Sequence, residues 1–497
     1  MNHSSSVFNR DRLVIFGLCA IFLLLAIGRA KTSLPWVDEG YFYDSFYNWI
    51  QHGHTGASVV ESKGLPWEGI EQHQYWQPPL LLIWATAWLK VFGLSLTAFR
   101  SLAIFGGLWF LASWIYLLNY FGVPAGLRNL ALLFIATDYA VIRAGSDGRP
   151  DMLSAAFGLG AFALYLRFRD RNFTLAIFLS QLLGVCAGLT HPIGGVTGLG
   201  FVLFFFIKDK DWRKLKLIHL PLAIMPYALG AAGWGAYIMQ DPESFRKIFF
   251  GSAASGRLSG LSHPLLALQH EIVVRYLTPY GLLGHSLAFK LKLLIPAVYA
   301  AGALLAWVIT PVRRQKFLRP FLAMWAIACF AVFAIDNQRN GTYLVDLFPH
   351  YAVLLAAVLW WLYQKRGWRQ ALVVVAAACF VALQAGGTLY IILTNPYQRQ
   401  YQPVVDYVLL HAKPGDRIIG SSELGFGIGF DRLHDDLSLG YYVDKKPDLI
   451  IWNSRYQAWS DAARGTPPGD FVRNRLAKFK KVFETTEFQV YTPAAKN

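Results

Sequence analysis

The sequence predicts a polytopic α-helical membrane protein with a small α/β domain at its C-terminal end. Of its 497 residues, 55% are hydrophobic and only 15% are charged, and the mean hydropathy is +0.37. Soluble domains contain about 25% charged residues. Apolar runs such as 13–27, 102–118 and 371–393 approach the ~20 residues that a membrane-spanning helix needs.

The net charge of +16 does not indicate a nucleic-acid partner in this setting. The basic residues cluster in short loops between apolar runs, which is the signal that orients membrane proteins. The four cysteines all lie inside apolar runs, so we expect no disulfides. Arg10 and Arg12 precede the first apolar run, and we expect that run to be an uncleaved first span.

The loop charges also decide how the chain crosses the membrane. The stretch 79–93 reaches only ~22 Å as a helix at ~1.5 Å per residue, short of the ~30 Å hydrocarbon core. If it does not span, every dense basic loop falls on the side of the N-terminus, and if it does, the later ones move to the opposite side. We therefore predict a surface helix at 79–93 and eleven spans. The spans are 13–30, 97–121, 129–143, 152–166, 173–189, 194–207, 217–239, 291–310, 317–335, 344–363 and 371–394.

This arrangement of the spans places four segments on the outer face, namely 31–96, 144–151, 240–290 and the tail from 395. The tail is less apolar, with strand-like runs at 417–421, 448–452, 481–485 and 488–491 and helix-like runs at 401–412 and 471–478. We predict a transmembrane domain over 1–394 and an extracytoplasmic α/β domain over 395–497.

Two acidic clusters meet on the outer face in this arrangement. Asp38 and Glu39 follow the first span, and Asp147 and Asp151 precede the fourth. A carboxylate near a hydroxyl or amine can remove its proton as a general base, and a second can orient the acceptor or hold a metal. The alternative is that these acids only mark the water boundary at the span ends.

The order of these motifs resembles the GT-C class of membrane glycosyltransferases. It runs from an apolar span to DEGYFY, an aromatic loop, YWQPPLL and, two spans on, RAGSDGRPDM. The protein O-mannosyltransferase-like family and the bacterial lipid A aminoarabinose transferase are the most similar groups. The resemblance implies that a sugar is moved from a polyprenyl-phosphate carrier to a lipid, glycan or protein acceptor outside the membrane. It further implies Asp38 as base and Asp151 as its acidic partner, and a single displacement of the carrier phosphate would make the reaction inverting.

The segment 339–356, RNGTYLVDLFPHYAVLLA, is similar to a basic-x-x-x-Tyr segment of the same family. The resemblance places Arg339 and Tyr343 near the carrier phosphate. Where the aminoarabinose transferase has an acidic and a basic residue before its proline pair, this chain has Trp76 and Gln77. Metal dependence is therefore left open, with a divalent metal as one possibility.

Asp38, Asp151 and Glu39 are the catalytic candidates. The substrate-binding candidates are Tyr75, Gln77, Asp147, Arg149, His191, Arg275, Lys292, Arg339 and Tyr343. The long segment 240–290 is either an ordinary loop over the site or a lid whose basic residues bind a phosphate.

Two rival functions remain, a transporter or flippase of lipid-linked sugars and a glycan polymerase. A transporter buries its polar site near the bilayer midplane, whereas these acids fall at the outer boundary. The family resemblance implies a bacterial inner membrane with the active site facing the periplasm.

Overall fold

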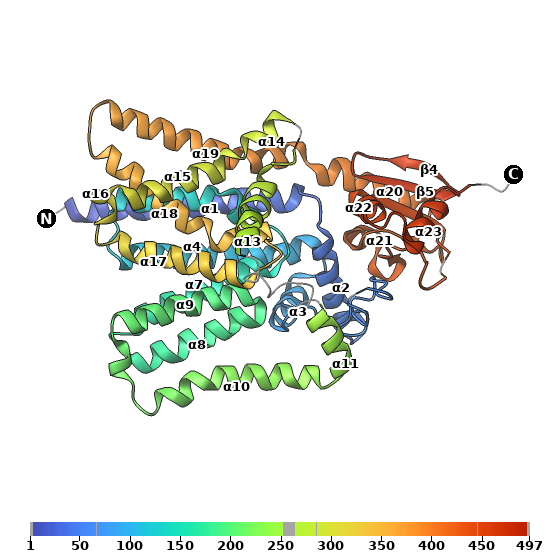
Figure 1. Cartoon of the computed structure of the whole chain (residues 1–497), viewed down its shortest axis with the longest axis horizontal. Coiled ribbons are helices and arrows are strands. Elements are labelled where there is room, and N and C mark those ends of the chain that lie inside the picture. The colour runs from blue at the N-terminus through green and yellow to red at the C-terminus, as the bar shows by residue number, and fades with distance from the viewer. Residues whose placement is uncertain (1–2, 66, 252–263, 285, 445, 495–497) are drawn as a thin grey trace.

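The computed structural model of the chain describes residues 3–65, 67–251, 264–284, 286–444 and 446–494. Long helices run side by side along the long axis of the molecule and form a bundle, and the strands lie beyond its far end (Figure 1). The bundle helices are α1 (His3–Thr32), α4 (Leu96–Tyr120), α5 (Ala125–Thr137), α6 (Tyr139–Ala144), α7 (Pro150–Phe168), α8 (Phe173–Thr190), α9 (Pro192–Lys208), α10 (His219–Ile238), α15 (Leu294–Val308), α17 (Leu318–Ile335), α18 (Phe348–Tyr363) and α19 (Trp368–Thr394).

Six of the described helices are long and apolar enough to cross a membrane. A seventh candidate is the bent pair made by α10 and residues 242–250. Each predicted span is occupied mainly by helix, but α5, α9, α15 and α18 are shorter apolar helices of 10–17 residues. The chain is thus a mainly helical protein with several candidate spans, and the number eleven stays a prediction.

The predicted span 129–143 is broken in the middle. Asp138 caps the start of α6 by accepting from the N–H groups of Ala140 (2.8 Å) and Val141 (3.0 Å). Tyr299 of α15 donates to the same carboxylate at 2.8 Å. A side chain that competes with the backbone for hydrogen bonds ends one helix and starts the next, so α5 ends before Asp138 and α6 begins after it.

Helix α7 is the most buried helix of the bundle and packs against α4, α8 and α9. Its contact with α9 requires glycine: a Cβ at Gly158 would lie 2.1 Å from the carbonyl oxygen of Gly194. Two backbones can approach this closely only without side chains. The start of α7, which carries Asp151, is therefore held firmly.

Short elements close both ends of the bundle. At the end facing the strands lie α2 (Val37–Gln51) and α3 (Leu80–Phe92), and α3 packs against α2, α4 and α8 (Figure 1). The predicted aromatic loop is thus partly helical, and the predicted surface helix lies beside it. The remaining short elements before the tail are α11 (Pro242–Phe245), η2 (Arg246–Phe250), α13 (Pro264–His270), η3 (Glu271–Leu277), η4 (Thr278–Tyr280), α14 (Leu287–Leu291), η5 (Gly341–Asp346), η1 (Asp211–Lys214) and α16 (Thr310–Arg313).

The C-terminal segment, residues 397–493, contains a five-stranded sheet in the order β2-β1-β3-β5-β4. The β1–β2 and β1–β3 pairs are parallel, whereas β3–β5 and β4–β5 are antiparallel. Its elements are η6 (Tyr397–Tyr401), α20 (Gln402–His411), β1 (Ile418–Ile419), η7 (Ser422–Leu424), α21 (Gly425–Ile428), η8 (Phe430–Arg432), β2 (Leu433–His434), β3 (Leu449–Asn453), α22 (Ser454–Ala462), α23 (Pro467–Leu476), β4 (Phe479–Glu484) and β5 (Phe488–Pro493). The four strand-like runs of the sequence coincide with β1, β3, β4 and β5, and β2 and α22 are additional. Whether this segment is an independent domain stays a prediction.

The C-terminal segment is joined to helix α2 by direct contacts. The Ser422 hydroxyl donates to the carbonyl of Val37 at 2.9 Å, and a Cβ at Gly40 would lie 2.5 Å from the Ser422 backbone. The backbone of Asp435 also exchanges hydrogen bonds with the loop that follows α2, at Val59 (2.7 Å) and Glu61 (3.1 Å). The helix that carries Asp38 thus rests on the C-terminal segment.

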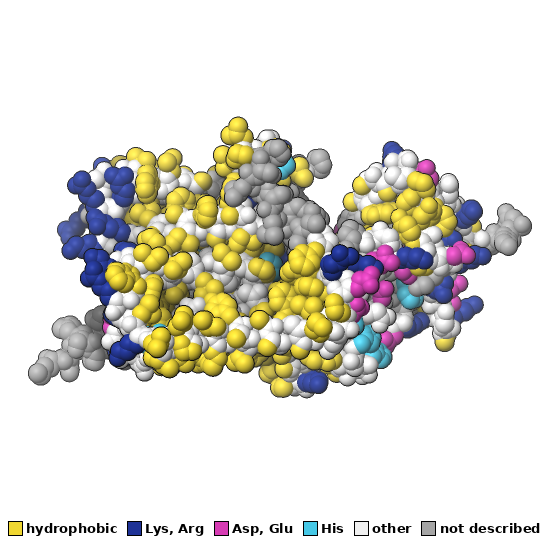
Figure 2. Space-filling model, turned by 60° about the horizontal axis from the view of Figure 1, so that its bottom comes forward, with side chains coloured by type: hydrophobic (Ala, Val, Ile, Leu, Met, Phe, Trp, Pro, Cys, Tyr) yellow, Lys and Arg dark blue, Asp and Glu magenta, His cyan; other side chains and the backbone are white. Residues whose placement is uncertain are grey.

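Apolar side chains cover much of the face of the bundle seen in Figure 2, and Lys and Arg gather at the end opposite the C-terminal segment. The loops at that end include the basic stretches 208–216, 313–319 and 365–369. Charges of both signs are mixed on the C-terminal segment (Figure 2). The predicted one-sided distribution of basic loops is therefore present in the fold.

Candidate active site

Helix α2 begins with two acidic residues whose surroundings differ. The backbone N–H of Trp36 donates to the Glu39 carboxylate at 2.8 Å, which closes the first turn as in a capping box. The Asp38 side chain is 21% exposed, whereas the Glu39 side chain is fully buried. One turn of helix therefore places one carboxylate near solvent and the other in the interior.

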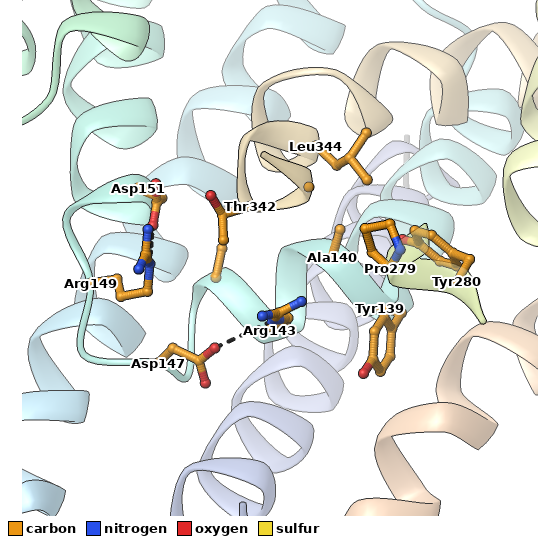
Figure 3. A pocket seen from close by; sticks show the side chains of 12 residues that line it. Tyr139, Ala140, Arg143, Asp147, Arg149, Asp151, Pro279, Tyr280, Thr342 and Leu344 are labelled. Carbon is orange, nitrogen blue, oxygen red and sulfur yellow. Dashed lines mark hydrogen bonds and ion pairs between the residues drawn. The ribbon is translucent and has the colours of Figure 1, made fainter. Parts of the chain in front are cut away.

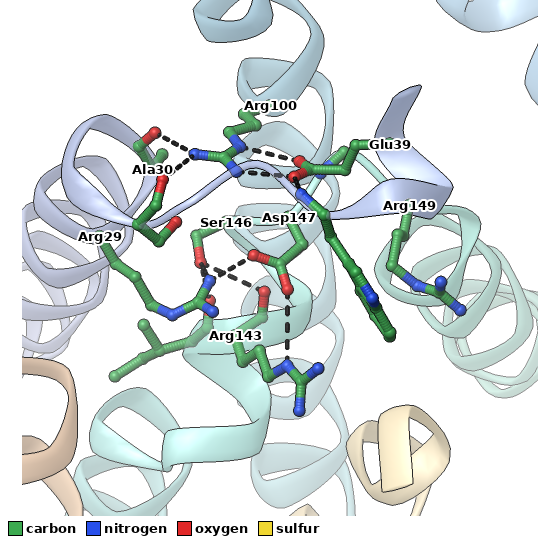
Figure 4. Close-up of polar contacts among 12 residues, drawn as sticks. Arg29, Ala30, Glu39, Arg100, Arg143, Ser146, Asp147 and Arg149 are labelled. Carbon is green, nitrogen blue, oxygen red and sulfur yellow. Dashed lines mark hydrogen bonds and ion pairs between the residues drawn. The ribbon is translucent and has the colours of Figure 1, made fainter. Parts of the chain in front are cut away.

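Glu39 is saturated by its partners (Figure 4). Arg100 of α4 donates to both of its oxygens, at 2.8 and 2.6 Å, and the N–H of Gly148 donates at 2.5 Å. Arg100 also donates to the carbonyls of Ala30 (2.7 Å) and Leu34 (3.1 Å). A buried ion pair with all of its lone pairs and protons used fixes geometry, and here it ties α1, α2, α4 and the loop before α7 together.

Arg149 joins the two predicted catalytic acids. Its Nε donates to Asp151 at 2.8 Å, and its other arm forms an ion pair with Asp38. Burial lowers the pKa of Arg149, but the carboxylates of Asp151 and Asp38 outweigh burial, so that the pKa is raised above its ordinary value. Its guanidinium also lies 4.4 Å from the Trp36 ring centre. The second oxygen of Asp151 is buried and makes no hydrogen bond within the described structure.

Asp147 belongs to a second cluster in the same loop (Figure 4). Arg29 forms an ion pair with one of its oxygens and donates to Ser146 at 2.6 Å, while Nε of Arg143 lies 3.5 Å from the other oxygen. Burial raises the pKa of Asp147, but Arg29 and Arg143 overcome this effect and hold the pKa below its usual range. Asp147 is therefore an anion held between two cations.

Arg149 and Asp151 of the first cluster and Asp147 of the second line two adjoining cavities, whereas Asp38 and Glu39 line neither. The smaller one is narrow and reaches the Arg149–Asp151 pair (Figure 3). Its wall is formed by Tyr139, Ala140, Arg143, Ala144, Asp147, Arg149, Asp151, Pro279, Tyr280, Gly341, Thr342 and Leu344. Since Pro279 and Tyr280 belong to the segment 240–290, part of that segment lines the smaller cavity.

The larger cavity, of about 550 Å³, lies between the bundle and the C-terminal segment. Tyr139, Arg143 and Asp147 line both cavities. The bundle side of the larger one is completed by Arg29, Leu34, Pro35, Trp36 and Val37, and the opposite wall by Ser421, Glu423, Asn453, Ser454, Arg455, Glu487 and Phe488. A chamber with this many polar groups suits a hydrophilic ligand.

Glu423 is the most deeply buried acid of the opposite wall. Ser421 donates to it at 2.5 Å and Asn453 at 3.1 Å. Burial raises its pKa from 4.5 to about 7; the nearby Asp435 adds to this rise, and the hydrogen bond from Ser421 opposes it. Arg455 in the same wall is paired with Asp435 at 2.8 Å and donates to the hydroxyl of Tyr41 at 2.5 Å.

Arg275 and Arg339, predicted to bind a phosphate, lie in a buried ionic cluster. Arg275 donates to Glu271 at 2.6 Å and lies 3.0 Å from Asp336. Arg339 lies 3.1 Å from Glu271 and donates to the carbonyl of Phe333 at 2.5 Å. Neither arginine lines the two cavities. Both arginines are thus already paired with carboxylates of the protein, and they share Glu271.

The other predicted binding residues fall into two groups. His191 and Tyr343 meet, with their side-chain polar atoms 3.2 Å apart, and Tyr343 lies in η5 between Thr342 and Leu344, which line the smaller cavity. Lys292 lies 4.9 Å from the ring of Tyr139, a residue of both cavities. By contrast, Tyr75 is buried and donates to the carbonyl of Tyr237 at 2.9 Å, and the oxygen of the Gln77 amide is buried without a hydrogen bond in the described structure.

Three residues of the site, Arg143, Arg29 and Glu423, were not predicted from the sequence. Arg143 opens the motif RAGSDGRPDM and stands four residues before Asp147, a spacing at which charged side chains on a helix meet. The sequence thus contained a signal for Arg143. No local pattern relates Arg29 or Glu423 to the site, because only the tertiary fold brings them there.

The predicted acids do not form a metal site in this arrangement. Among the described residues, no three His, Cys, Asp or Glu side chains gather as metal ligands. The Arg149 guanidinium lies between the Asp38 and Asp151 carboxylates, at the place where a shared cation would have to bind. We therefore assign no role to a metal in the chemistry below.

No family model and no curated protein sequence matches the chain. Solved structures do resemble it. ArnT from Cupriavidus metallidurans bound to undecaprenyl phosphate has a TM-score of 0.59 at 14% identity, covering 97% of this chain and 98% of that one. The oligosaccharyltransferase AglB from Archaeoglobus fulgidus, in complex with an inhibitory peptide and a dolichol-phosphate, has a TM-score of 0.51 at 14% identity, covering 97% and 74%. The same enzyme with Zn and sulfate has a TM-score of 0.52 at 12% identity, covering 96% and 73%.

Both neighbours are GT-C glycosyltransferases, ArnT being the lipid A aminoarabinose transferase. Identities of 12–14% establish the shape of the chain and leave its substrates open. The resemblance inferred from the order of the sequence motifs is therefore confirmed at the level of architecture. The chain has the GT-C fold.

Proposed function

We propose that the protein is a membrane glycosyltransferase that moves a sugar from a polyprenyl-phosphate donor to an acceptor. The observation that carries the proposal is the Asp38–Arg149–Asp151 cluster, built from α2 and α7 beside two cavities at one end of an apolar bundle. The GT-C fold, in which neighbours have been seen with undecaprenyl phosphate or a dolichol-phosphate, supports a lipid-linked donor.

The reaction that fits this cluster is a single displacement. Asp38 takes the proton from the acceptor hydroxyl or amine, because it is the partly exposed carboxylate of the pair. The acceptor then attacks the anomeric carbon, the bond from that carbon to the phosphate oxygen breaks, and the lipid phosphate departs with its electron pair. One such displacement inverts the anomeric centre.

Arg149 and Asp151 hold the base Asp38 in position. The guanidinium fork holds the Asp38 carboxylate in one orientation, and Asp151 with the Trp36 ring holds the guanidinium. Arg149 is therefore a positioning residue. Glu39 has the same kind of role one step further away, since its oxygens are taken by Arg100 and backbone N–H groups.

The distribution of charge supports an outward-facing site. The basic loops 208–216, 313–319 and 365–369 lie at the end opposite the C-terminal segment. Since short basic loops stay in the cytoplasm, the cavities would open to the outside, which in a bacterial inner membrane is the periplasm. The acceptor would then be a lipid, glycan or protein of the cell envelope.

Transfer can be tested with the purified full chain in lipid nanodiscs. Polyprenyl phosphates carrying radiolabelled hexoses, pentoses and amino sugars would be incubated with it and with envelope lipid, glycan and protein fractions. We expect label to move from at least one donor to an acceptor, with release of the polyprenyl phosphate. Movement of intact donor between leaflets without cleavage would instead identify a flippase, and processive chain growth a polymerase.

A further inference from the structure

We propose that Arg143 binds the phosphate of the lipid-linked donor and stabilises it as it leaves. The proposal rests on the proposed function and identifies the residue that receives the leaving group. It departs from the family resemblance, which points to Arg339 for this task. The reason lies in which arginines still have donors to offer.

A phosphate that gains negative charge during transfer needs a cation whose N–H groups are not already satisfied. Most of the arginines around the site already use a terminal guanidinium nitrogen in an ion pair with a carboxylate. These are Arg29 with Asp147, Arg100 with Glu39, Arg149 with Asp38 and Asp151, Arg275 with Glu271 and Asp336, Arg339 with Glu271, and Arg455 with Asp435.

Arg143 differs from all of them. Its closest carboxylate contact is 3.5 Å, from Nε to Asp147, and its side chain is 28% exposed. Its terminal nitrogens make no hydrogen bond to the described part of the chain. Figure 3 shows the side chain reaching from α6 toward the middle of the cavity. Its guanidinium fork is therefore available to a ligand.

The position of Arg143 also fits the reaction. It lies in the walls of both cavities. The Trp36 ring lies 5.0 Å from the Arg143 guanidinium and 4.4 Å from that of Arg149. The same aromatic ring thus lies next to both the available cation and the guanidinium that pairs with the base Asp38. A sugar bound there would have its phosphate near Arg143 and the acceptor near Asp38, as an in-line displacement requires.

The alternative is that Arg143 only holds Asp147 in place. Asp147 is already fixed by its ion pair with Arg29, and its backbone N–H donates to the Arg143 carbonyl at 3.0 Å, a bond that survives any change of the Arg143 side chain. A contact of 3.5 Å is long for a charged hydrogen bond. Holding Asp147 therefore accounts for little of what the Arg143 side chain does.

The test compares binding of undecaprenyl phosphate and of undecaprenol, its neutral analogue, to the full chain in detergent. The variants are Arg143→Ala, Arg143→Lys and, as a matched control, Arg399→Ala, which removes an exposed arginine of η6. We expect Arg143→Ala to weaken undecaprenyl phosphate binding by about ten- to hundredfold, the cost of losing a charged hydrogen bond, and to leave undecaprenol binding unchanged. Arg143→Lys should recover part of the loss, because it restores the charge without the fork.

Each outcome separates the two proposals. If the wild-type chain binds undecaprenyl phosphate and Arg143→Ala binds it equally well, Arg143 is not the phosphate site and the proposed function stands. Equal weakening of undecaprenol and undecaprenyl phosphate binding would likewise overturn the Arg143 proposal, since the effect would then be structural. If the wild-type chain binds undecaprenol and undecaprenyl phosphate with the same affinity, no phosphate is recognised and the proposed function fails.

Discussion

Asp38 and Glu39 are neighbours in one turn of α2, yet the fold treats them in opposite ways. Glu39 is fully buried and shares two charged hydrogen bonds with Arg100. Asp38 is partly exposed and has a single arginine partner, which it shares with Asp151. The difference teaches that the type of residue at a span end does not decide its role. How many of its lone pairs the protein occupies is the better guide.

The largest effect that this comparison predicts is on turnover. We expect Asp38→Asn to lower kcat by about 10²–10⁴, the contribution of a general base, while the melting temperature stays close to that of the wild type. Transfer assays and thermal melting in the same detergent would measure both. A variant with wild-type kcat would remove Asp38 from the chemistry.

The next largest effect is on stability and concerns the buried pair of Glu39 and Arg100. Arg100→Met leaves Glu39 buried without its cation, and breaking such a pair costs about 3–5 kcal/mol. We expect a large fall in the melting temperature, partly reversed in the double variant Glu39→Gln/Arg100→Met, in which no charge remains buried. If the single variant melted like the wild type, the cluster would not hold the turn.

A smaller effect is expected at Arg149, which joins the partly exposed Asp38 to the buried Asp151. Arg149→Lys keeps the charge between Asp38 and Asp151 but loses the two-armed geometry. We expect kcat to fall by about tenfold, as for the loss of one charged hydrogen bond, and KM to change little, because Arg149 positions the base and does not contact the substrate. A rise in KM at constant kcat would make it a substrate-binding residue instead.

The smallest effect extends the comparison to Glu423, a buried acid with neutral partners. Its pKa is raised from 4.5 to about 7, so the folded state keeps a proton that the unfolded chain releases. Stability should therefore fall as the pH rises from about 4.5 to 7. Glu423→Gln should melt like the wild type at pH 4 and be more stable at pH 8 by on the order of 1 kcal/mol, less than the shift implies in full. Parallel melting curves over pH 4–8 would contradict this assignment.

The course of the chain could be predicted from the sequence because it depends on local properties. Apolar length, loop charge and the short reach of residues 79–93 were enough to place the helices and to bring Asp38 and Asp151 to one end. The break at Asp138 escaped prediction, since an acid inside an apolar run reads equally well as a tolerated polar residue. The short strand β2 has only two residues and no pattern of its own.

The candidate site was predictable only in part. The two acids were found from their spacing to the spans, but their bridge through Arg149 depends on how α2 lies against the start of α7. Arg275 has Glu271 four residues before it, a local sign that its charge is compensated. The pairing of Arg339 with the same glutamate joins residues far apart in the sequence. Which arginine keeps donors for a ligand is therefore a property of the tertiary structure.

The close approach of Gly40 to Ser422 has a consequence for how this protein can be taken apart. With no room for even a methyl group between α2 and η7, residues 395–497 are not an appendage that could be deleted or exchanged freely. A chain cut after Thr394 would leave the turn that carries Asp38 without its neighbour, and a graft from a relative would have to reproduce the shape of η7. The bundle and the C-terminal segment would be expected to evolve together. Substitutions that change the ligand would then occur in the walls of the larger cavity and not at the contact between Gly40 and Ser422.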